Sequence, residues 1–166
     1  GQGIGMAVGM AMAETMLAEK FNTKNHKIID HYTYVLLGEG CLMEGVSSEA
    51  SSLAGHLKLG KLIVFYDENR ISIDGSTDIT FTENIAQRYE SYGWQVLQGS
   101  MYDYQQIESL VEEAKKDDRP SLIMLKSEIG KGAPTVVGKS AAHGAPLGEE
   151  GVKAAKEFFQ STMEEI

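Results

Sequence analysis

A regular alternation of short apolar runs with longer helix-forming segments constrains the fold of this chain more than any other feature. The clearest run covers residues 62–66, where five apolar or aromatic residues follow one another, as in a strand buried on both faces of a sheet. Similar buried strands are expected at 34–37, 94–97 and 121–125, and helices at 4–21, 44–57, 82–92, 104–116 and 149–165. This order predicts an α/β fold, a parallel sheet with helices on both faces and right-handed crossovers.

The helical segments carry further signals. Segment 4–21 is apolar and rich in methionine on most faces, so we expect a buried helix whose methionines belong to the core. Thr82 and Asp103 are expected to cap the helices that they begin, because a short polar side chain can accept hydrogen bonds from the first helical N–H groups. Residues 127–148 are expected to form a long functional or mobile loop.

Length, charge and cysteine content limit the organisation of the chain and the class of partner. With 166 residues, 1–166 is expected to be a single domain. The net charge of −9 and the lack of a basic stripe argue against nucleic acid as a partner. No apolar run is long enough to span a membrane, so no membrane partner is expected. The single Cys41 cannot form an internal disulfide, which favours a reducing compartment such as the cytoplasm.

Two polar motifs follow the first two expected strands. Gly38-Glu39-Gly40 comes directly after 34–37, and Asn69 follows the strand 62–66 closely. Because parallel strands bring their carboxyl ends to one edge of the sheet, Glu39 and Asn69 are expected to be neighbours where α/β proteins bind ligands. A carboxylate, an amide oxygen and a backbone carbonyl are the ligands that Mg²⁺ or Ca²⁺ takes. Magnesium completes its shell with phosphate oxygens and water, so these motifs predict a metal–diphosphate site.

The same motifs resemble the thiamine-diphosphate motif, which begins with Gly-Asp-Gly and ends with Asn. More narrowly, the whole chain resembles the transketolase family. The resemblance rests on these strings: His31-Tyr-Thr-Tyr34, Gly40-Cys-Leu-Met-Glu-Gly45, Ser52-Leu-Ala-Gly55, Leu57-Lys-Leu-Gly-Lys-Leu62, Ile71-Ser-Ile-Asp-Gly75, Tyr92-Gly-Trp94 and His143-Gly-Ala-Pro-Leu147. It implies the thiamine-diphosphate-binding fold and an enzyme that transfers a two-carbon ketol unit between sugar phosphates, with thiamine diphosphate and a divalent metal.

The resemblance also implies the ligands of the cofactor. The metal ligands would be Glu39, Asn69 and the carbonyl of Ile71, and through the metal Glu39 would also help to hold the cofactor. The diphosphate would be contacted by Gly40, Asn69 and His143.

Catalytic roles follow from the same resemblance. His143 would face the substrate and handle protons near the thiazolium carbon, as a histidine can near neutral pH. Glu44 and Glu49 would lie near a subunit interface, where family members link two active sites through carboxylates. The partners implied are sugar phosphates and either a second copy in a homodimer or a pyrimidine-binding domain.

The chain departs from the family pattern in two respects. Glu39 stands where the family has Asp, and Mg²⁺ requires near-octahedral geometry, so metal affinity is expected to be weaker unless the backbone adjusts. The family's Gly-Pro-Leu-Gly-Gln-Gly motif is cut here to Gly1-Gln2-Gly3, so we expect a truncated piece of a longer protein. The domain whose Glu activates the aminopyrimidine is also absent, and since such acid–base help contributes about 10²–10⁴-fold, the piece alone is expected to be inactive.

Two other functions compete with this interpretation. One is an enzyme of the same cofactor class with another substrate, such as a deoxyxylulose-phosphate synthase. The other is a folded non-catalytic fragment that binds neither metal nor cofactor, which the glutamate at position 39 favours.

Overall fold

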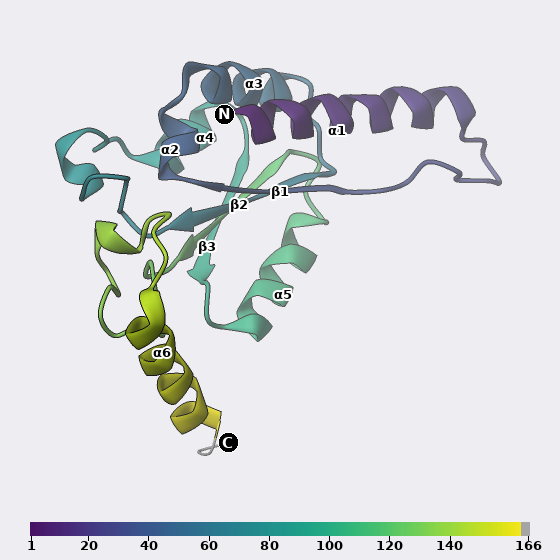
Figure 1. Cartoon of the computed structure of the whole chain (residues 1–166). Helices are drawn as coiled ribbons and strands as arrows, with labels where there is room; N and C mark the ends of the chain where they lie inside the picture. Colours follow the sequence, from purple (N-terminus) through teal and green to yellow (C-terminus); the bar gives the residue numbers. More distant parts are fainter. Residues whose placement is uncertain (164–166) are drawn as a thin grey trace. The chain divides into compact units, whose positions relative to one another are not determined.

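The computed structural model describes the backbone of residues 1–163 and the side chains of residues 1–160. The expected α/β fold is confirmed, and the final two residues of the last expected helix lie outside the described part. Along the described residues the elements follow in this order: α1 (Gln2–Phe21), β1 (Thr33–Gly38), α2 (Glu39–Met43), α3 (Gly45–His56), β2 (Leu62–Glu68), the 3₁₀ helix η1 (Thr77–Ile79), α4 (Ile85–Ser91), β3 (Gln95–Ser100), α5 (Tyr104–Ala114), β4 (Ser121–Lys126), the 3₁₀ helix η2 (Ser140–Ala142) and α6 (Gly148–Met163) (Figure 1).

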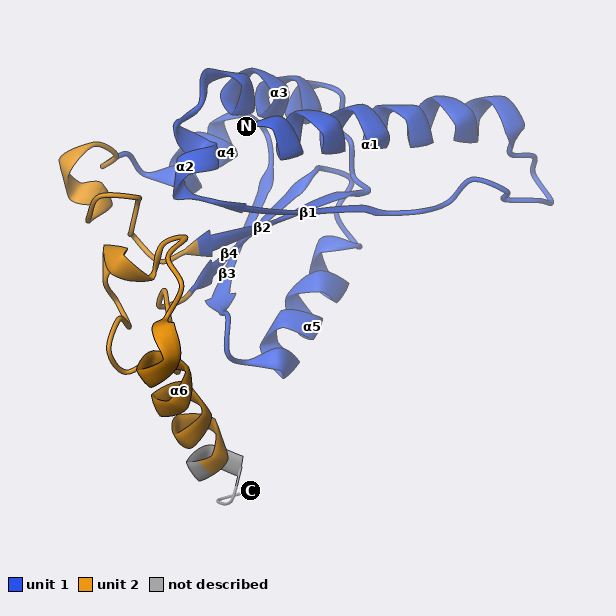
Figure 2. Ribbon diagram, viewed as in Figure 1, with its two compact units in different colours: residues 1–67, 83–126 blue, residues 68–82, 127–166 orange. Residues whose placement is uncertain are grey.

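The chain divides into two compact units, which Figure 2 shows in different colours. The first contains residues 1–67 and 83–126, and therefore the sheet with α1 to α5. The second contains residues 68–82 and the segment after residue 126, with η1, η2 and α6. The expectation of a single domain stays a prediction.

The four strands of the first unit form one sheet in the order β1-β2-β4-β3. β1 pairs with β2 in parallel from Thr33 opposite Leu62 to Gly38 opposite Asp67. β3 pairs with β4 in parallel from Gln95 opposite Ser121 to Ser100 opposite Lys126. Within each of these two pairs the strands end at the same level, so their carboxyl ends lie at one edge of the sheet.

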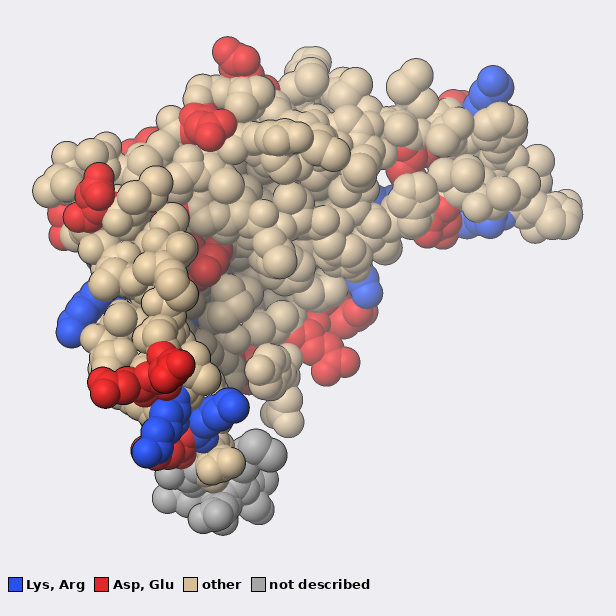
Figure 3. All heavy atoms as spheres, viewed as in Figure 1, with Lys and Arg blue, Asp and Glu red and all other residues tan. Residues whose placement is uncertain are grey.

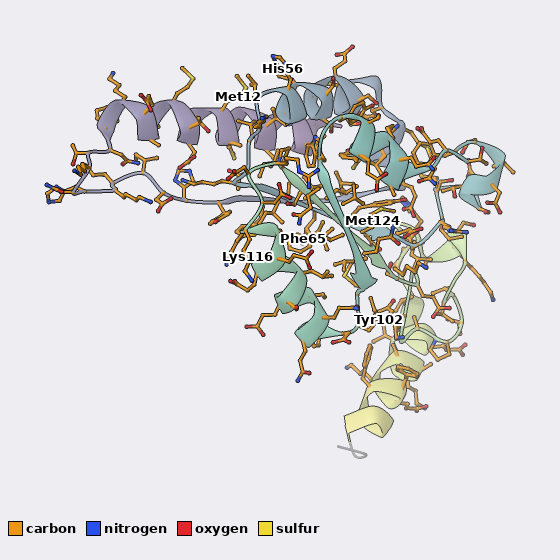
Figure 4. All side chains as sticks on the ribbon, turned by 180° about the vertical axis from the view of Figure 1, so that it is seen from behind. Met12, His56, Phe65, Tyr102, Lys116 and Met124 are labelled. Atoms are coloured by element: carbon orange, nitrogen blue, oxygen red, sulfur yellow. The ribbon has the colours of Figure 1, made fainter. Side chains whose placement is uncertain are left out.

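Helices cover both faces of this sheet. On one face α5 packs over β3 and β4, and the core there is built around the fully buried side chains of Ile63, Ala114 and Ile123. On the opposite face lie α1, α3 and α4 (Figure 1). Figure 4 labels Phe65 on the α5 side, where it packs against the same core, and His56 on the helix layer of the other side.

An aromatic cluster joins three of these elements. The rings of Tyr89 in α4 and Trp94 meet edge to face, with centroids 5.0 Å apart. Ser51 in α3 connects to both, since its hydroxyl donates to the Tyr89 hydroxyl at 3.1 Å and its carbonyl accepts from the Trp94 indole at 2.8 Å. Burial raises the pKa of Tyr89, so the neutral phenol is favoured here.

Two expectations about burial were wrong. β1 is an edge strand, and on it Tyr34 is 48% and Leu36 76% exposed. α1 buries only the stripe through Ile4, Ala7 and Ala11, while Met6, Met10 and Met16 are each more than half exposed. An apolar composition favours burial, but a covering element must be present, and the main contacts of α1 are with α3 and β1.

Helix boundaries also differ from those expected. The expected helix 44–57 is preceded by the short α2, with Glu44 extended between α2 and α3. Asn84 caps α4 instead of Thr82, because the side chain of Asn84 accepts from the N–H of Gln87. The expected cap at Asp103 is confirmed, since its carboxylate accepts from the N–H of Gln106 at 2.9 Å.

Candidate functional site

Glu39 lies directly after the end of β1. Gly38, the last residue of β1, pairs with Asp67 of β2, so the ends of the two strands are level. Glu39 is the first residue of α2 and only 3% exposed. A side chain at Gly40 would meet no atom of the protein within 4 Å, so the backbone beside the Glu39 carboxylate faces open space. A buried carboxylate is stable when hydrogen bonds, a cation or a metal compensate its charge.

Arg88 of α4 holds the short helix that carries Glu39. One guanidinium nitrogen donates to the carbonyl of Leu42 in α2 at 3.0 Å, and another pairs with Glu83 at 2.9 Å. The Arg88 side chain is only 15% exposed. The sequence interpretation missed this residue, because an arginine far along the chain gives no local signal that it will cap a helix elsewhere.

Asn69 and Ile71 lie in a tight turn of the second unit that starts where β2 ends. The side-chain oxygen of Asn69 accepts from the N–H of Ile71 at 2.9 Å. The N–H of Thr77 donates to the Arg70 carbonyl at 3.0 Å, and Ile71 forms an isolated bridge with Ser76. Asn69 and Ile71, both expected as metal ligands, are therefore brought together by a direct hydrogen bond.

The chemistry of these donors fits a hard divalent cation. A carboxylate, an amide oxygen and a backbone carbonyl are all oxygen ligands, and Mg²⁺ commonly takes few protein ligands beside phosphate and water. Across the described residues, no three side chains of His, Cys, Asp or Glu come close enough to hold a metal by themselves. Whether the amide and carbonyl oxygens of the Asn69–Ile71 turn serve as ligands stays a prediction.

His143 follows η2 in the second unit. Its N–H donates to the Ser140 carbonyl at 2.8 Å, and Gly144 after it has a φ of 73°. Its side chain is exposed and, within the described residues, makes no hydrogen bond or ion pair. The imidazole is therefore accessible to a ligand, and its contacts with the other predicted site residues stay a prediction.

Glu44 and Glu49 lie at the beginning of α3 in the first unit. The Glu44 carboxylate is 60% exposed. Its carbonyl accepts from the N–H and the hydroxyl of Ser47, which closes the first turn of α3. Glu49 is exposed on the same helix. The structure thus leaves both carboxylates at the surface, and their expected role at an interface stays a prediction.

The distribution of charge can be followed on one face of the molecule. On the face that Figure 3 shows, Asp and Glu lie in small groups beside Lys and Arg, and no continuous basic stripe appears. Among the described residues, no helix is both long enough and apolar enough to cross a membrane.

Comparison with known proteins identifies relatives across the whole chain. The family model for the thiamine diphosphate binding domain of transketolase matches residues 1–165. The transketolase of Treponema pallidum is 70% identical over 94% of this chain, and that of Bacillus subtilis is 52% identical over 99%. The chain spans about a quarter of the length of these curated relatives, 24% and 25% respectively.

Solved structures give the same result. A Pichia stipitis transketolase in complex with sedoheptulose-7-phosphate aligns with a TM-score of 0.92 at 50% identity, covering 95% of this chain and 24% of that one. The Campylobacter jejuni transketolase aligns with a TM-score of 0.89 at 46% identity, with the same coverage. This chain therefore belongs to the transketolase family and corresponds to its thiamine diphosphate binding domain.

Proposed function

We propose that this chain holds the diphosphate of thiamine diphosphate and its divalent metal in a transketolase that transfers a two-carbon ketol unit between sugar phosphates. The observation that carries the proposal is that β1 and β2 end at the same level, because Gly38 of β1 pairs with Asp67 of β2. Glu39 follows directly after Gly38, and Asn69 comes two residues after Asp67. Ligands of α/β proteins bind at this edge of the sheet. The family match over residues 1–165 supports the same cofactor.

Under this proposal Glu39, Asn69 and the Ile71 carbonyl are the metal ligands. Glu39 is buried in the first turn of α2, and Asn69 is oriented by its hydrogen bond from Ile71. Gly40 gives the diphosphate access to the backbone, since nothing fills the space of a side chain there. The cofactor, when bound, supplies the carbon nucleophile for ketol transfer.

His143 is proposed to bind the diphosphate and to hold a proton near the reacting carbon. Its exposed imidazole in a glycine-flanked turn supports this role, because the ring is free to meet a ligand.

Glu44 and Glu49 are proposed to face a second subunit in a homodimer, which their exposure on α3 supports. A cytoplasmic location is proposed as well, which the single cysteine supports. We also propose that residues 1–166 form one domain, because the family match extends over residues 1–165.

Calorimetric titration of thiamine diphosphate into the chain, with and without Mg²⁺, tests the site. We expect binding that requires Mg²⁺, and Glu39→Gln is expected to weaken it at least about tenfold, as losses around a metal site generally do. Glu39→Asp restores the family's shorter carboxylate and is expected to bind at least as tightly as the wild type. Glu108→Gln, which changes an exposed carboxylate of α5, is the control and should bind normally.

Absence of Mg²⁺-dependent binding in both the wild type and Glu39→Asp would contradict the proposed site. It would favour the alternative of a folded domain that binds no cofactor.

A second experiment concerns turnover. Because the chain spans about a quarter of its relatives' length, we propose that these 166 residues bind the cofactor without completing the reaction. A coupled assay with a ketose phosphate and an aldose phosphate should detect no ketol transfer by the chain alone. Robust turnover under these conditions would refute this part of the proposal.

A further inference from the structure

Arg70 has an unusual backbone conformation between two of the proposed metal ligands. Its φ of 59° lies in the left-handed region, which residues other than Gly, Asn and Asp adopt rarely because of steric repulsion at Cβ. The side chain is 73% exposed, with one guanidinium nitrogen 3.7 Å from the Glu68 carboxylate. Such a conformation persists only where the surrounding structure holds it in place.

The hydrogen bonds of the turn account for this conformation. The left-handed residue reverses the chain so that the N–H of Ile71 points back to the side-chain oxygen of Asn69. The Arg70 carbonyl then accepts from Thr77, whose side chain is buried, and Ser72 donates its N–H to Gly75 at 2.8 Å. The turn is thus closed on both sides of Arg70.

We infer that Arg70 is a positioning residue whose left-handed backbone sets the Asn69 amide and the Ile71 carbonyl in the relative orientation that the metal requires. The inference rests on the proposed function, because it takes these two groups to be ligands. Mg²⁺ demands near-ideal octahedral geometry, so two ligands on adjacent sides of one residue must be held together by the backbone between them. Unfavourable backbone conformations that persist in a fold are concentrated at such sites.

Substitutions at position 70 distinguish the effect of the backbone conformation on metal binding from the effect of the side chain. Arg70→Gly and Arg70→Asn remove the guanidinium but accept a positive φ, so their Mg²⁺ affinity with thiamine diphosphate should stay near that of the wild type. Arg70→Val also removes the guanidinium, but its branched Cβ opposes a positive φ, and we expect affinity about tenfold lower by calorimetry. Lys58→Val is the matched control, because Lys58 is the other non-glycine residue with positive φ among the described residues, at 51°.

The control separates lost stability from lost ligand geometry. Lys58→Val should lower the thermal midpoint of unfolding, as Arg70→Val does, while leaving Mg²⁺ affinity unchanged. Wild-type affinity in Arg70→Val, or equally weak binding in Arg70→Gly and Arg70→Val, would overturn the inference.

Amide hydrogen exchange of the free chain provides a second readout that needs no cofactor. Arg70→Val should accelerate exchange at the N–H groups of Ile71 and Thr77, which the turn protects, whereas Arg70→Gly should leave them protected. Unchanged exchange at both positions in Arg70→Val overturns the inference by itself. Failure of the proposed function would look different: the wild-type chain would not bind thiamine diphosphate with Mg²⁺, although exchange at Ile71 still responded to Arg70→Val.

Discussion

A side chain at Gly55 would meet the Tyr92 carbonyl and the Trp94 ring. Gly55 lies in α3, and Tyr92 and Trp94 flank Gly93, whose φ of 85° is left-handed. The glycine therefore permits close approach between α3 and the segment that enters β3. Two of the strings that relate this chain to its family, Ser52-Leu-Ala-Gly55 and Tyr92-Gly-Trp94, thus meet in the packing of the core.

Gly55→Ala is expected to destabilise the fold by about 1–3 kcal/mol, as overpacking of a well-packed interior does. Urea unfolding followed by Trp94 fluorescence measures the change. Gly9→Ala in α1 is the matched control, because a Cβ at Gly9 meets nothing within 4 Å. Since alanine is the better helix former, Gly9→Ala should raise stability by up to about 1 kcal/mol. Equal effects of the two substitutions would contradict the packing role of Gly55.

The sequence predicted some positions better than others, for physical reasons. The positions of Glu39 directly after β1 and of Asn69 directly after β2 are confirmed, because strand ends are marked by a change from apolar to polar residues. The left-handed conformation of Arg70 could not be predicted, because arginine has no preference for it and the hydrogen bonds that hold it come from residues up to Thr77. Arg88 escaped notice because its bond to Leu42 spans 46 positions of the chain.

At the scale of elements, Lys61, which directly precedes β2, connects α1 and the segment before β1 to the sheet through two ion pairs. Its ammonium group pairs with Glu14 of α1 and with Asp30, in both cases at 2.6 Å. The Glu14 side chain is only 4% exposed, whereas that of Lys61 is 33% exposed. A buried carboxylate without its cation is costly, so this pair contributes to the attachment of α1 alongside its buried apolar residues.

Lys61→Met should therefore lower the free energy of unfolding by roughly 2–3 kcal/mol, less than for a fully buried pair because Lys61 is partly solvated. The double variant Glu14→Gln/Lys61→Met should recover part of the loss. Lys115→Met is the control, since Lys115 pairs with the exposed Glu112 and its loss should cost clearly less. If Lys61→Met and Lys115→Met cost the same in urea unfolding, the anchoring role of Lys61 is wrong.

The pH dependence of Asp30 follows from the same contact. The hydrogen bond from Lys61, aided by its charge, lowers the pKa of Asp30 below 3.8. A lowered pKa in the folded state means that the contribution of Asp30 to stability is present above pH 3.8 and is lost as the pH falls through the folded pKa. Urea unfolding of the wild type and Asp30→Asn should differ at neutral pH and converge below pH 3.8. A difference that persists in acid would contradict this assignment.

At the scale of the whole molecule, the periodicity of the sequence predicted the fold class. It did not predict which faces of the helices and strands would be buried. The apolar run 62–66 became the buried strand β2, because neighbouring strands and helices cover it on both sides. The runs in α1 and β1 are equally apolar, yet Met10 and Leu36 are exposed. Apolar residues favour burial, but they are buried only where other helices or strands cover them.

The proposed site places the metal and the diphosphate where β1 and β2 end. Mn²⁺ in place of Mg²⁺ tests it directly, because this paramagnetic ion broadens the NMR signals of nearby amides. With thiamine diphosphate present, we predict that Mn²⁺ broadens the amides of Gly40, Asn69 and Ile71, and spares that of Ser109 in α5. Broadening centred elsewhere, or none at Gly40 and Asn69 at concentrations where thiamine diphosphate binds, would contradict this placement.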